Sequence, residues 1–258
     1  MSTAAGSAAA LLVEARQSGR RLPGLAAERL PGDDEAAYAV QEAVIRRLGV
    51  AVAGWKVGAA NAAAAPSAAP LFAPLVRPSP AVFAVTPENF RAVEAELALS
   101  LARDLPPRAR PYGEDEVWDA VAAAHVAIEL LDTRYESRDK MSPAALLADN
   151  LSNAGFCHGP PIAGWRAIDF LTVEARLAID GHEVKRAVGG NPAGHPRRLL
   201  AWLANHAASR GRPLRSGDIV TTGSHTGVAI APPGARVAVR FAGLGEAVLT
   251  LAGPDERC

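Results

Sequence analysis

The stretch Val93-Glu94-Ala95-Glu96-Leu97-Ala98-Leu99-Ser100 decides the fold. Its odd-numbered positions are all apolar, and both glutamates stand at even-numbered positions. Successive side chains of a β-strand point to opposite faces, so this alternation predicts a strand with one face in a core. Glu94 and Glu96 then share the other face, with Cα atoms roughly 6.5–7 Å apart.

The rest of the chain repeats this strand pattern and adds few helices. The sequence predicts helices at 8–17, 34–48, 114–123 and 196–209 and strands at 54–58, 126–131, 172–179, 183–188, 218–222, 236–241 and 246–251. Strands are seldom separated by full crossover helices, and glycine-rich phosphate loops are absent, which disfavours a doubly wound parallel sheet. We therefore expect an α+β fold with a mostly β body.

We expect two parts that form one structural unit. Residues 1–78 are predicted to be a helical N-terminal lobe plus a connecting loop, because the segment after Gly58 is rich in proline and alanine up to about Pro80. Residues 79–258 are predicted to be the β-rich catalytic core.

Composition excludes several classes of protein. The 258 residues are 49% hydrophobic and 21% charged, which is typical of a globular chain and not of a disordered one. Lys plus Arg and Asp plus Glu both number 27, so no overall field attracts nucleic acid or an acidic membrane. Without a long uncharged apolar run or a signal-peptide pattern, we expect a cytoplasmic protein with no membrane partner. Cys157 and Cys258 are too few for a disulfide framework, so a metal here needs oxygen ligands.

Three glutamates are candidates for such a metal site. Glu94 and Glu96 repel each other unless a cation lies between them, although both are also compatible with a solvated strand face. Glu129 stands in the apolar run Ala127-Ile128-Glu129-Leu130-Leu131-Asp132, and a buried carboxylate needs a partner or a metal. Three carboxylates leave about three positions of an octahedral Mg²⁺ or Mn²⁺ for water or substrate. Asp132 is expected to pair with Arg134.

Lys56 is a further candidate, within Gly54-Trp55-Lys56-Val57-Gly58. The glycines of this run allow other backbone to come close. A lone lysine in a strand is usually a solvated edge residue. Beside a metal site it can instead contact a substrate carboxylate or move a proton.

Six runs of sequence together resemble a known family. They are Gly54 to Gly58, Val93 to Leu97, Ala127 to Arg134, Ala148-Asp149-Asn150, Leu200 to Asn205 and Gly217 to Ser224. In this order they resemble the 2-keto-4-pentenoate hydratase family, which includes 4-oxalocrotonate decarboxylase and belongs to the fumarylacetoacetate hydrolase superfamily. The resemblance covers nearly the whole chain.

The resemblance implies a mixed β-roll or barrel-like core with a helical N-terminal lobe. It also implies Mg²⁺ or Mn²⁺ held by Glu94, Glu96 and Glu129, and homo-oligomers that are often built from pentamers. Family substrates are small 2-oxo or 2-hydroxydienoic acids, which chelate the metal and react through an enolate. Hydratases of the family add water to the distal alkene, whereas decarboxylases release CO₂ into the same electron sink.

One position departs from the family pattern. Family hydratases carry Pro-Asp-aromatic-Gly after the lysine strand, and this chain has Pro70-Leu71-Phe72-Ala73, in which Leu71 cannot move a proton. His225 is a candidate to supply an imidazole instead, or is only a loop residue bonded to backbone.

The remaining candidates are substrate-binding residues. Ser224 and Thr226 are expected to donate hydrogen bonds to a substrate carboxylate, or to serve only the turn that contains them. The resemblance implies that Asp149-Asn150 positions the following loop, with Asn153, beside the substrate, although helix termination also explains Asp149-Asn150. Arg77 is a conceivable contact for a distal carboxylate.

These residues lead to one hypothesis and its alternatives. The chain is predicted to be a divalent-metal-dependent hydratase-type lyase acting on a small 2-oxo acid, with Lys56 and His225 as catalytic residues. The alternatives are a decarboxylase of a 2-oxo-enedioate and a repurposed or non-catalytic oxo-acid-binding homologue.

Overall fold

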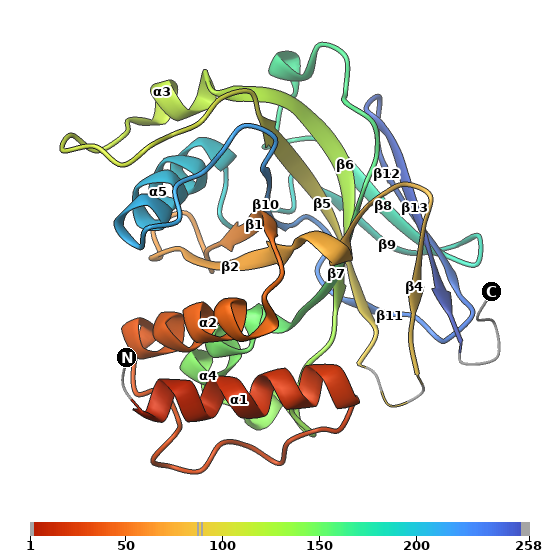
Figure 1. Ribbon diagram of the computed structural model, residues 1–258. Helices are drawn as coiled ribbons and strands as arrows, with labels where there is room; N and C mark the ends of the chain where they lie inside the picture. Colours follow the sequence, from red (N-terminus) through yellow and green to blue (C-terminus); the bar gives the residue numbers. More distant parts are fainter. Residues whose placement is uncertain (1–2, 87, 89, 254–258) are drawn as a thin grey trace.

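The computed structural model describes residues 3–86, 88 and 90–253, and its body consists of two β-sheets with helices gathered at one side (Figure 1). The helices are α1 (Thr3–Ser18), α2 (Asp34–Leu48), α3 (Glu114–Trp118), α4 (Pro143–Ala148) and α5 (Pro196–Ser209). The strands are β1 (Val52–Gly58), β2 (Ser67–Phe72), β3 (Val76–Pro78), β4 (Ala81–Ala84), β5 (Ala92–Leu101), β6 (Val121–Leu131), β7 (Asn153–His158), β8 (Glu174–Ile179), β9 (His182–Val188), β10 (Ile219–Ser224), β11 (Ala229–Ile230), β12 (Arg236–Phe241) and β13 (Gly245–Ala252).

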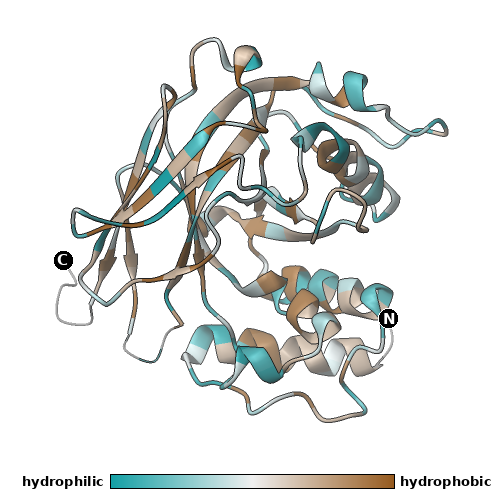
Figure 2. Cartoon of the chain, turned by 180° about the vertical axis from the view of Figure 1, so that it is seen from behind, coloured by the Kyte–Doolittle hydropathy of each residue, from teal (hydrophilic) through white to brown (hydrophobic). Residues whose placement is uncertain are grey.

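Both sheets are mixed. The larger has the strand order β2-β1-β10-β5-β6-β7-β3 with β11 beside β5, and the smaller has the order β4-β13-β12-β8-β9. The pairs β1–β10, β3–β7 and β4–β13 are parallel, and the other pairs are antiparallel. The predicted α+β class with a mixed β core and few helices is therefore confirmed. Figure 2 shows hydrophobic stretches running through the strands of this body.

The central pair of strands, β5 and β6, has the alternation that the sequence predicts. Val93, Ala95 and Leu97 are completely buried in the core. Glu94 pairs directly with Glu129 across the two strands, so the carboxylates lie together on the other face of the sheet. The register of one antiparallel pair thus assembles the candidate site.

The helices α1 and α2 pack on each other and, with α4, form a second apolar cluster beside the larger sheet (Figure 1). The Asp33 side chain caps α2 by accepting a hydrogen bond of 2.8 Å from the backbone N–H of Ala36. Gly49 ends the helix with a φ of 64°, a conformation that suits glycine. Both helices predicted for this lobe are confirmed. Among the described residues, no helix combines the length and the apolar character that a membrane crossing requires.

Two predictions about secondary structure are wrong. The segment after Gly58, expected to be loop up to about Pro80, contains β2 and β3, which pair with β1 and β7. Small apolar residues of β2, such as Ala68 and Ala69, are fully buried, so its alanines serve the core and not a flexible connection. The helix expected over 114–123 ends at Trp118, because the residues from Val121 onward belong to the buried strand β6.

Gly54 shows why this position has no side chain. A Cβ atom added at Gly54 would lie 1.9 Å from the carbonyl oxygen of Ile219 on the neighbouring strand β10. The predicted close approach of another backbone is therefore confirmed. Gly58, on the same strand, has open space at the corresponding point.

We predict that Gly54→Ala destabilises the fold and that Gly58→Ala does not. The first substitution forces β1 away from β10 and should lower the free energy of unfolding by about 1–3 kcal/mol, the usual cost of overpacking a core. The second should change it by less than about 0.5 kcal/mol. Urea denaturation of both variants measures the difference, and equal stability of the two would contradict the close approach.

Candidate metal centre

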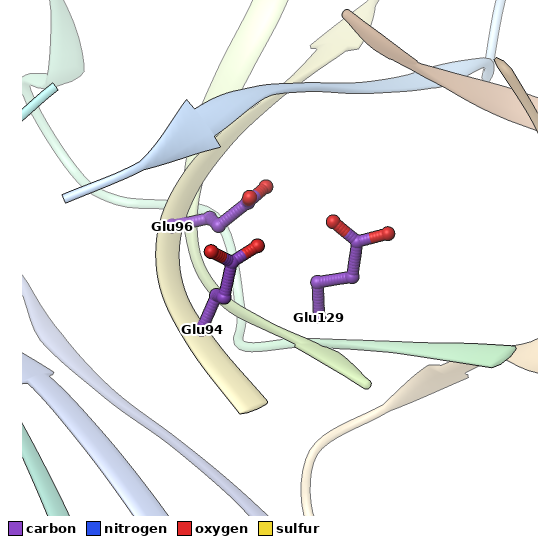
Figure 3. Close-up of side chains that lie close together, drawn as sticks. All are labelled: Glu94, Glu96 and Glu129. Carbon is purple, nitrogen blue, oxygen red and sulfur yellow. The ribbon is translucent and has the colours of Figure 1, made fainter. Parts of the chain in front are cut away.

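Three carboxylates converge on one face of the larger sheet. Glu94 and Glu96 project from β5 and Glu129 projects from β6, and all three point into a common space (Figure 3). One carboxylate oxygen from each residue lies within 4.8 Å of the corresponding oxygens of the other two. Glu129 is 0% exposed and Glu96 is 2% exposed, whereas Glu94 is half-buried.

The electrostatics of this group require compensation. Burial raises the pKa of the Glu94 carboxyl, and the nearby charge of Glu129 raises it further. The pKa of Glu96 is raised well above its ordinary value by burial first and then by Glu129 and Glu94. The three carboxylates therefore need protons or a cation to remain together.

Glu129 has one oxygen satisfied and one without a partner. Its Oε1 accepts hydrogen bonds from Lys56 Nζ at 2.6 Å and from Asn153 Nδ2 at 2.8 Å. Its Oε2 is buried and has no hydrogen-bond partner among the described residues. Because buried carboxylate oxygens are normally satisfied, this oxygen is suited to a ligand that the protein itself does not provide. Carboxylate oxygens are hard donors, and these are the ligands that a divalent cation such as Mg²⁺ or Mn²⁺ prefers.

Lys56 is the positive group that is hydrogen-bonded to this centre. Its side chain is 14% exposed, and besides Glu129 it donates a hydrogen bond of 3.2 Å to the carbonyl oxygen of Leu151. One ammonium balances at most one of three carboxylates, so its presence leaves room for a divalent charge. The structure thus brings Lys56 and Asn153 together with the three glutamates.

Thr221 is a site residue that the sequence does not reveal. Its hydroxyl donates a hydrogen bond to Glu96, and both side chains are buried. Thr221 lies on β10 opposite Lys56 of β1 and Ala98 of β5. Because β10 lies more than a hundred residues after β5 in the chain, only knowledge of the strand order could have identified this contact.

The three other predicted residues lie at the end of β10 or just after it. Ser224 is opposite Glu96, and its hydroxyl is close to Glu94 without a hydrogen bond of ordinary geometry. Thr226 is occupied by backbone, since its hydroxyl accepts from Ala95 N at 3.3 Å and donates to Gly227 O at 3.1 Å.

His225 is packed into the core. Its ring meets Phe241 of the smaller sheet edge-on at 5.0 Å, and its backbone N–H donates to Ala95 O at 2.8 Å. Burial lowers the pKa of His225 to about 4, so the imidazole is neutral at neutral pH. Within the described chain, no hydrogen bond or ion pair joins this ring to the three carboxylates.

A strained turn directs two groups to the site. Asn150, Leu151 and Ser152 are consecutive non-glycine residues with φ of 54°, 48° and 64°. Such conformations are costly and persist where the surroundings impose them. The turn is anchored by Asp149, which pairs with Arg134 and accepts a hydrogen bond of 3.0 Å from the backbone N–H of Arg134. It points Leu151 O at Lys56 and is followed directly by Asn153.

The expected pairing of Asp132 with Arg134 is wrong. Arg134 pairs with Asp149, and Asp132 accepts hydrogen bonds from Arg21 at 2.8 Å. The strand β6 ends at Leu131, so strand alternation does not govern the side chains that follow.

Leu71 lies on the face of the larger sheet that bears the carboxylates, and Arg77 lies on the other face. Leu71 is 1% exposed and belongs to an apolar cluster with Phe156. Neither side chain can accept or donate a proton. Arg77 is opposite Cys157, whereas Glu129 is opposite Phe156, so Arg77 lies on the other face of the sheet from the carboxylates. Its guanidinium stacks over Phe83 at 4.9 Å.

Comparison with known proteins agrees with this architecture. The family model described as Fumarylacetoacetate (FAA) hydrolase C-terminal matches residues 57–252. The chain is 33% identical over 232 residues to 2-keto-4-pentenoate hydratase from Burkholderia vietnamiensis, covering 84% of this chain and 86% of that protein. It is 32% identical over 132 residues to 4-oxalocrotonate decarboxylase from Pseudomonas putida, which is half of each chain.

A solved structure gives the same fold. The 4-oxalocrotonate decarboxylase from Pseudomonas putida G7, complexed with magnesium and adipate, superimposes with a TM-score of 0.82 over 96% of this chain and 97% of that chain, at 24% identity. The family resemblance inferred from the six runs of sequence is confirmed.

We predict that Glu129→Gln abolishes divalent-cation binding. The amide keeps the shape but removes the charge, and affinity for Mn²⁺ should fall by about 100-fold or more, beyond the 10–100-fold cost of losing only a supporting contact. Titration of metal-free protein with Mn²⁺, followed by electron paramagnetic resonance, measures this. Glu246→Gln, at an exposed position of β13, is the control and should bind as the wild type does. Unchanged affinity in Glu129→Gln would refute the site.

A second prediction concerns pH. The ordinary pKa of a glutamate is 4.5, and that of Glu96 is raised in the folded protein, so the folded state keeps a proton that the unfolded chain loses. This retained proton stabilises the folded state, and its contribution to the free energy of unfolding is complete below about pH 4.5. It is lost as the pH rises through the raised pKa, and the loss is about 1.4 kcal/mol for each pH unit that separates the folded and unfolded pKa values.

Between pH 5 and pH 8, metal-free wild type should therefore lose stability relative to Glu96→Gln, which keeps the acceptor for Thr221. Urea denaturation in a chelator measures both proteins, and added Mn²⁺ should restore the wild type. A parallel fall of the two proteins with pH would contradict the raised pKa.

Proposed function

The chain belongs to the fumarylacetoacetate hydrolase family, and we propose that it is a divalent-metal-dependent lyase that adds water to a small 2-hydroxydienoic or 2-oxo acid. The observation that carries this proposal is the convergence of Glu94, Glu96 and Glu129, with one buried oxygen of Glu129 left without a partner among the described residues. Hydratases that match most of this chain support the reaction type. A homo-oligomeric assembly and a cytoplasmic location remain part of the proposal.

The three glutamates would hold Mg²⁺ or Mn²⁺, which when bound supplies Lewis acidity toward the oxygens of a 2-oxo acid. The protein fixes these ligands beforehand. Thr221 holds Glu96, and Asn153 holds one oxygen of Glu129. Ligands held in this way need no reorganisation when the substrate arrives.

Lys56 is the proposed acid–base residue. It is the cation hydrogen-bonded to Glu129, and its side chain is not fully buried. Its contact with Leu151 O keeps the ammonium aligned with the site. From this position Lys56 can orient a substrate carboxylate or deliver a proton to the carbon skeleton. We retain Ser224 as the candidate for substrate binding, because its buried hydroxyl lies near Glu94 and has no hydrogen bond of ordinary geometry to any described residue.

Decarboxylation of a 2-oxo-enedioate is the second candidate. The face that bears the carboxylates continues into an apolar floor, since Ala98 and Ala127 lie two residues from Glu96 and Glu129 on their strands. Leu71 belongs to the same floor. Loss of CO₂ needs an electron sink but no acid–base group at that position, so the apolar floor is the observation that supports this second candidate.

We predict metal-dependent turnover with one of two substrates. Purified protein with Mn²⁺ is incubated with 2-hydroxypenta-2,4-dienoate, followed by its ultraviolet absorbance, and with 2-oxohex-3-enedioate, followed by CO₂ release. Absorbance loss without CO₂ supports hydration, and CO₂ release supports the second candidate. Either activity should disappear in a chelator and return with Mn²⁺. Turnover that survives exhaustive chelation, or binding of pyruvate without turnover of either substrate, would contradict the proposal.

The role of Lys56 has its own test. Lys56→Met should lower kcat by about 100-fold or more, as is typical for loss of an acid–base group, while Mn²⁺ affinity changes by less than about tenfold. Lys185→Met, on the exposed strand β9, is the control and should leave kcat unchanged. A kcat close to that of the wild type in Lys56→Met would exclude a proton-transfer role.

A further inference from the structure

A cavity of about 350 Å³ lies between α1, β3, the end of β4 and the end of β6. This volume is in the range of small-molecule sites in proteins. The cavity walls contain five arginines, namely Arg16, Arg21, Arg77, Arg91 and Arg134. No carboxylate of the metal centre belongs to its lining, and neither does Lys56.

The lining carries an excess of positive charge. Asp132 is the acidic residue in the cavity wall, and its carboxylate is engaged by Arg21 at 2.8 Å. Arg134 is neutralised by Asp149. Of the arginines in the described lining, Arg16 and Arg77 form no ion pair with a carboxylate of the described chain. An excess of guanidinium groups in a concave wall attracts anions.

Arg16 and Arg77 also keep most of their donors available. Arg16 Nη1 donates a long hydrogen bond of 3.4 Å to Asn153 O, and Arg77 Nη1 donates to Val82 O. Each guanidinium has five N–H donors, so most of them remain for a ligand. The pKa of Arg16 is lowered to about 9 by burial first and then by the nearby Arg134, as expected for a cation without an anionic partner.

The remaining lining is apolar. Leu75, Phe83, Val85, Leu130 and Leu131 complete the wall. Phe83 lies beneath the guanidinium of Arg77, and it also contacts the backbone of Gly155. A pocket with apolar walls and unpaired guanidinium groups matches a ligand that has a carbon skeleton and an anionic end.

We propose that this cavity binds a small organic carboxylate, with its carboxylate on Arg16 and Arg77 and its carbon skeleton against the apolar wall. The site is separate from the metal centre, because Arg77 lies on the face of the larger sheet opposite Glu129. The proposal does not depend on the proposed lyase activity, and it is tested without metal and without turnover.

The experiment is calorimetric titration of the full chain in a chelator with three probes. Hexanoate has the charge and the apolar skeleton, hexanamide lacks the charge, and inorganic phosphate lacks the skeleton. Hexanoate should bind at least tenfold more tightly than either of the others. Equal binding of hexanamide or of phosphate, or no binding of hexanoate at millimolar concentration, would overturn the proposal.

Substitution of the two arginines tests whether hexanoate binds in this cavity. Arg16→Gln and Arg77→Gln should each weaken hexanoate binding by tenfold or more. Arg20→Gln is the matched control, since Arg20 follows α1 closely, is highly exposed and is outside the cavity lining, and it should bind as the wild type does. Glu129→Gln should also bind normally, which separates this site from the metal centre.

The two arginine variants protect the test against a folding defect. If circular dichroism shows that Arg16→Gln is unfolded, Arg77→Gln carries the result, because Arg77 is exposed on the edge strand β3. Unchanged hexanoate affinity in a folded variant of either arginine would overturn the assignment of the cavity.

Discussion

The mutual repulsion of three carboxylates, two of them buried and one half-buried, is the constraint on which the rest of the structure depends. Glu94 and Glu129 are direct cross-strand partners, a pairing of like charges that destabilises an antiparallel ladder. The strands stay together because their other face is a completely buried apolar core that includes Val93 and Ala95. The favourable free energy of burial on one face therefore maintains an unfavourable charge arrangement on the other.

Three elements around the carboxylates provide hydrogen-bond partners for them. Strand β1 provides Lys56, strand β10 provides Thr221, and the turn before β7 provides Asn153. Two of these elements, β1 and the turn before β7, have an unusual backbone. Gly54 lets β1 approach β10 at a distance that no side chain allows, and three consecutive positive φ values place Leu151 O against Lys56. Local strain is thus concentrated where polar groups must meet a buried charge.

Sequence reasoning succeeded where a local pattern carries the information. Alternation identified β5, and a carboxylate in an apolar run identified Glu129 as a buried group in need of a partner. It failed where long-range pairing decides the structure. The alanines of β2 give no strand signal by themselves, and they become core residues only because β1 lies beside them.

The same limit applies to the site residues. Thr221 reaches Glu96 through the order of strands, and the partner of Arg134 is decided by a turn that follows α4. The role of His225 stays a prediction from its loop, and its ring packs against Phe241 of the smaller sheet just after the register shift in β10. None of these three contacts can be read from the spacing of the residues in the sequence.

Asn153 is the residue where the metal centre meets the arginine-lined cavity. Its amide donates to Glu129, and its carbonyl oxygen accepts from Arg16 at 3.4 Å and from Arg134 at 3.2 Å. A ligand that draws Arg16 away removes only the longer and weaker of these bonds. Arg134 remains fixed by Asp149 and continues to hold the carbonyl. The turn that positions Asn153 is therefore anchored by the ion pair and not by Arg16, so the cavity can exchange its contents while the carboxylates keep their geometry.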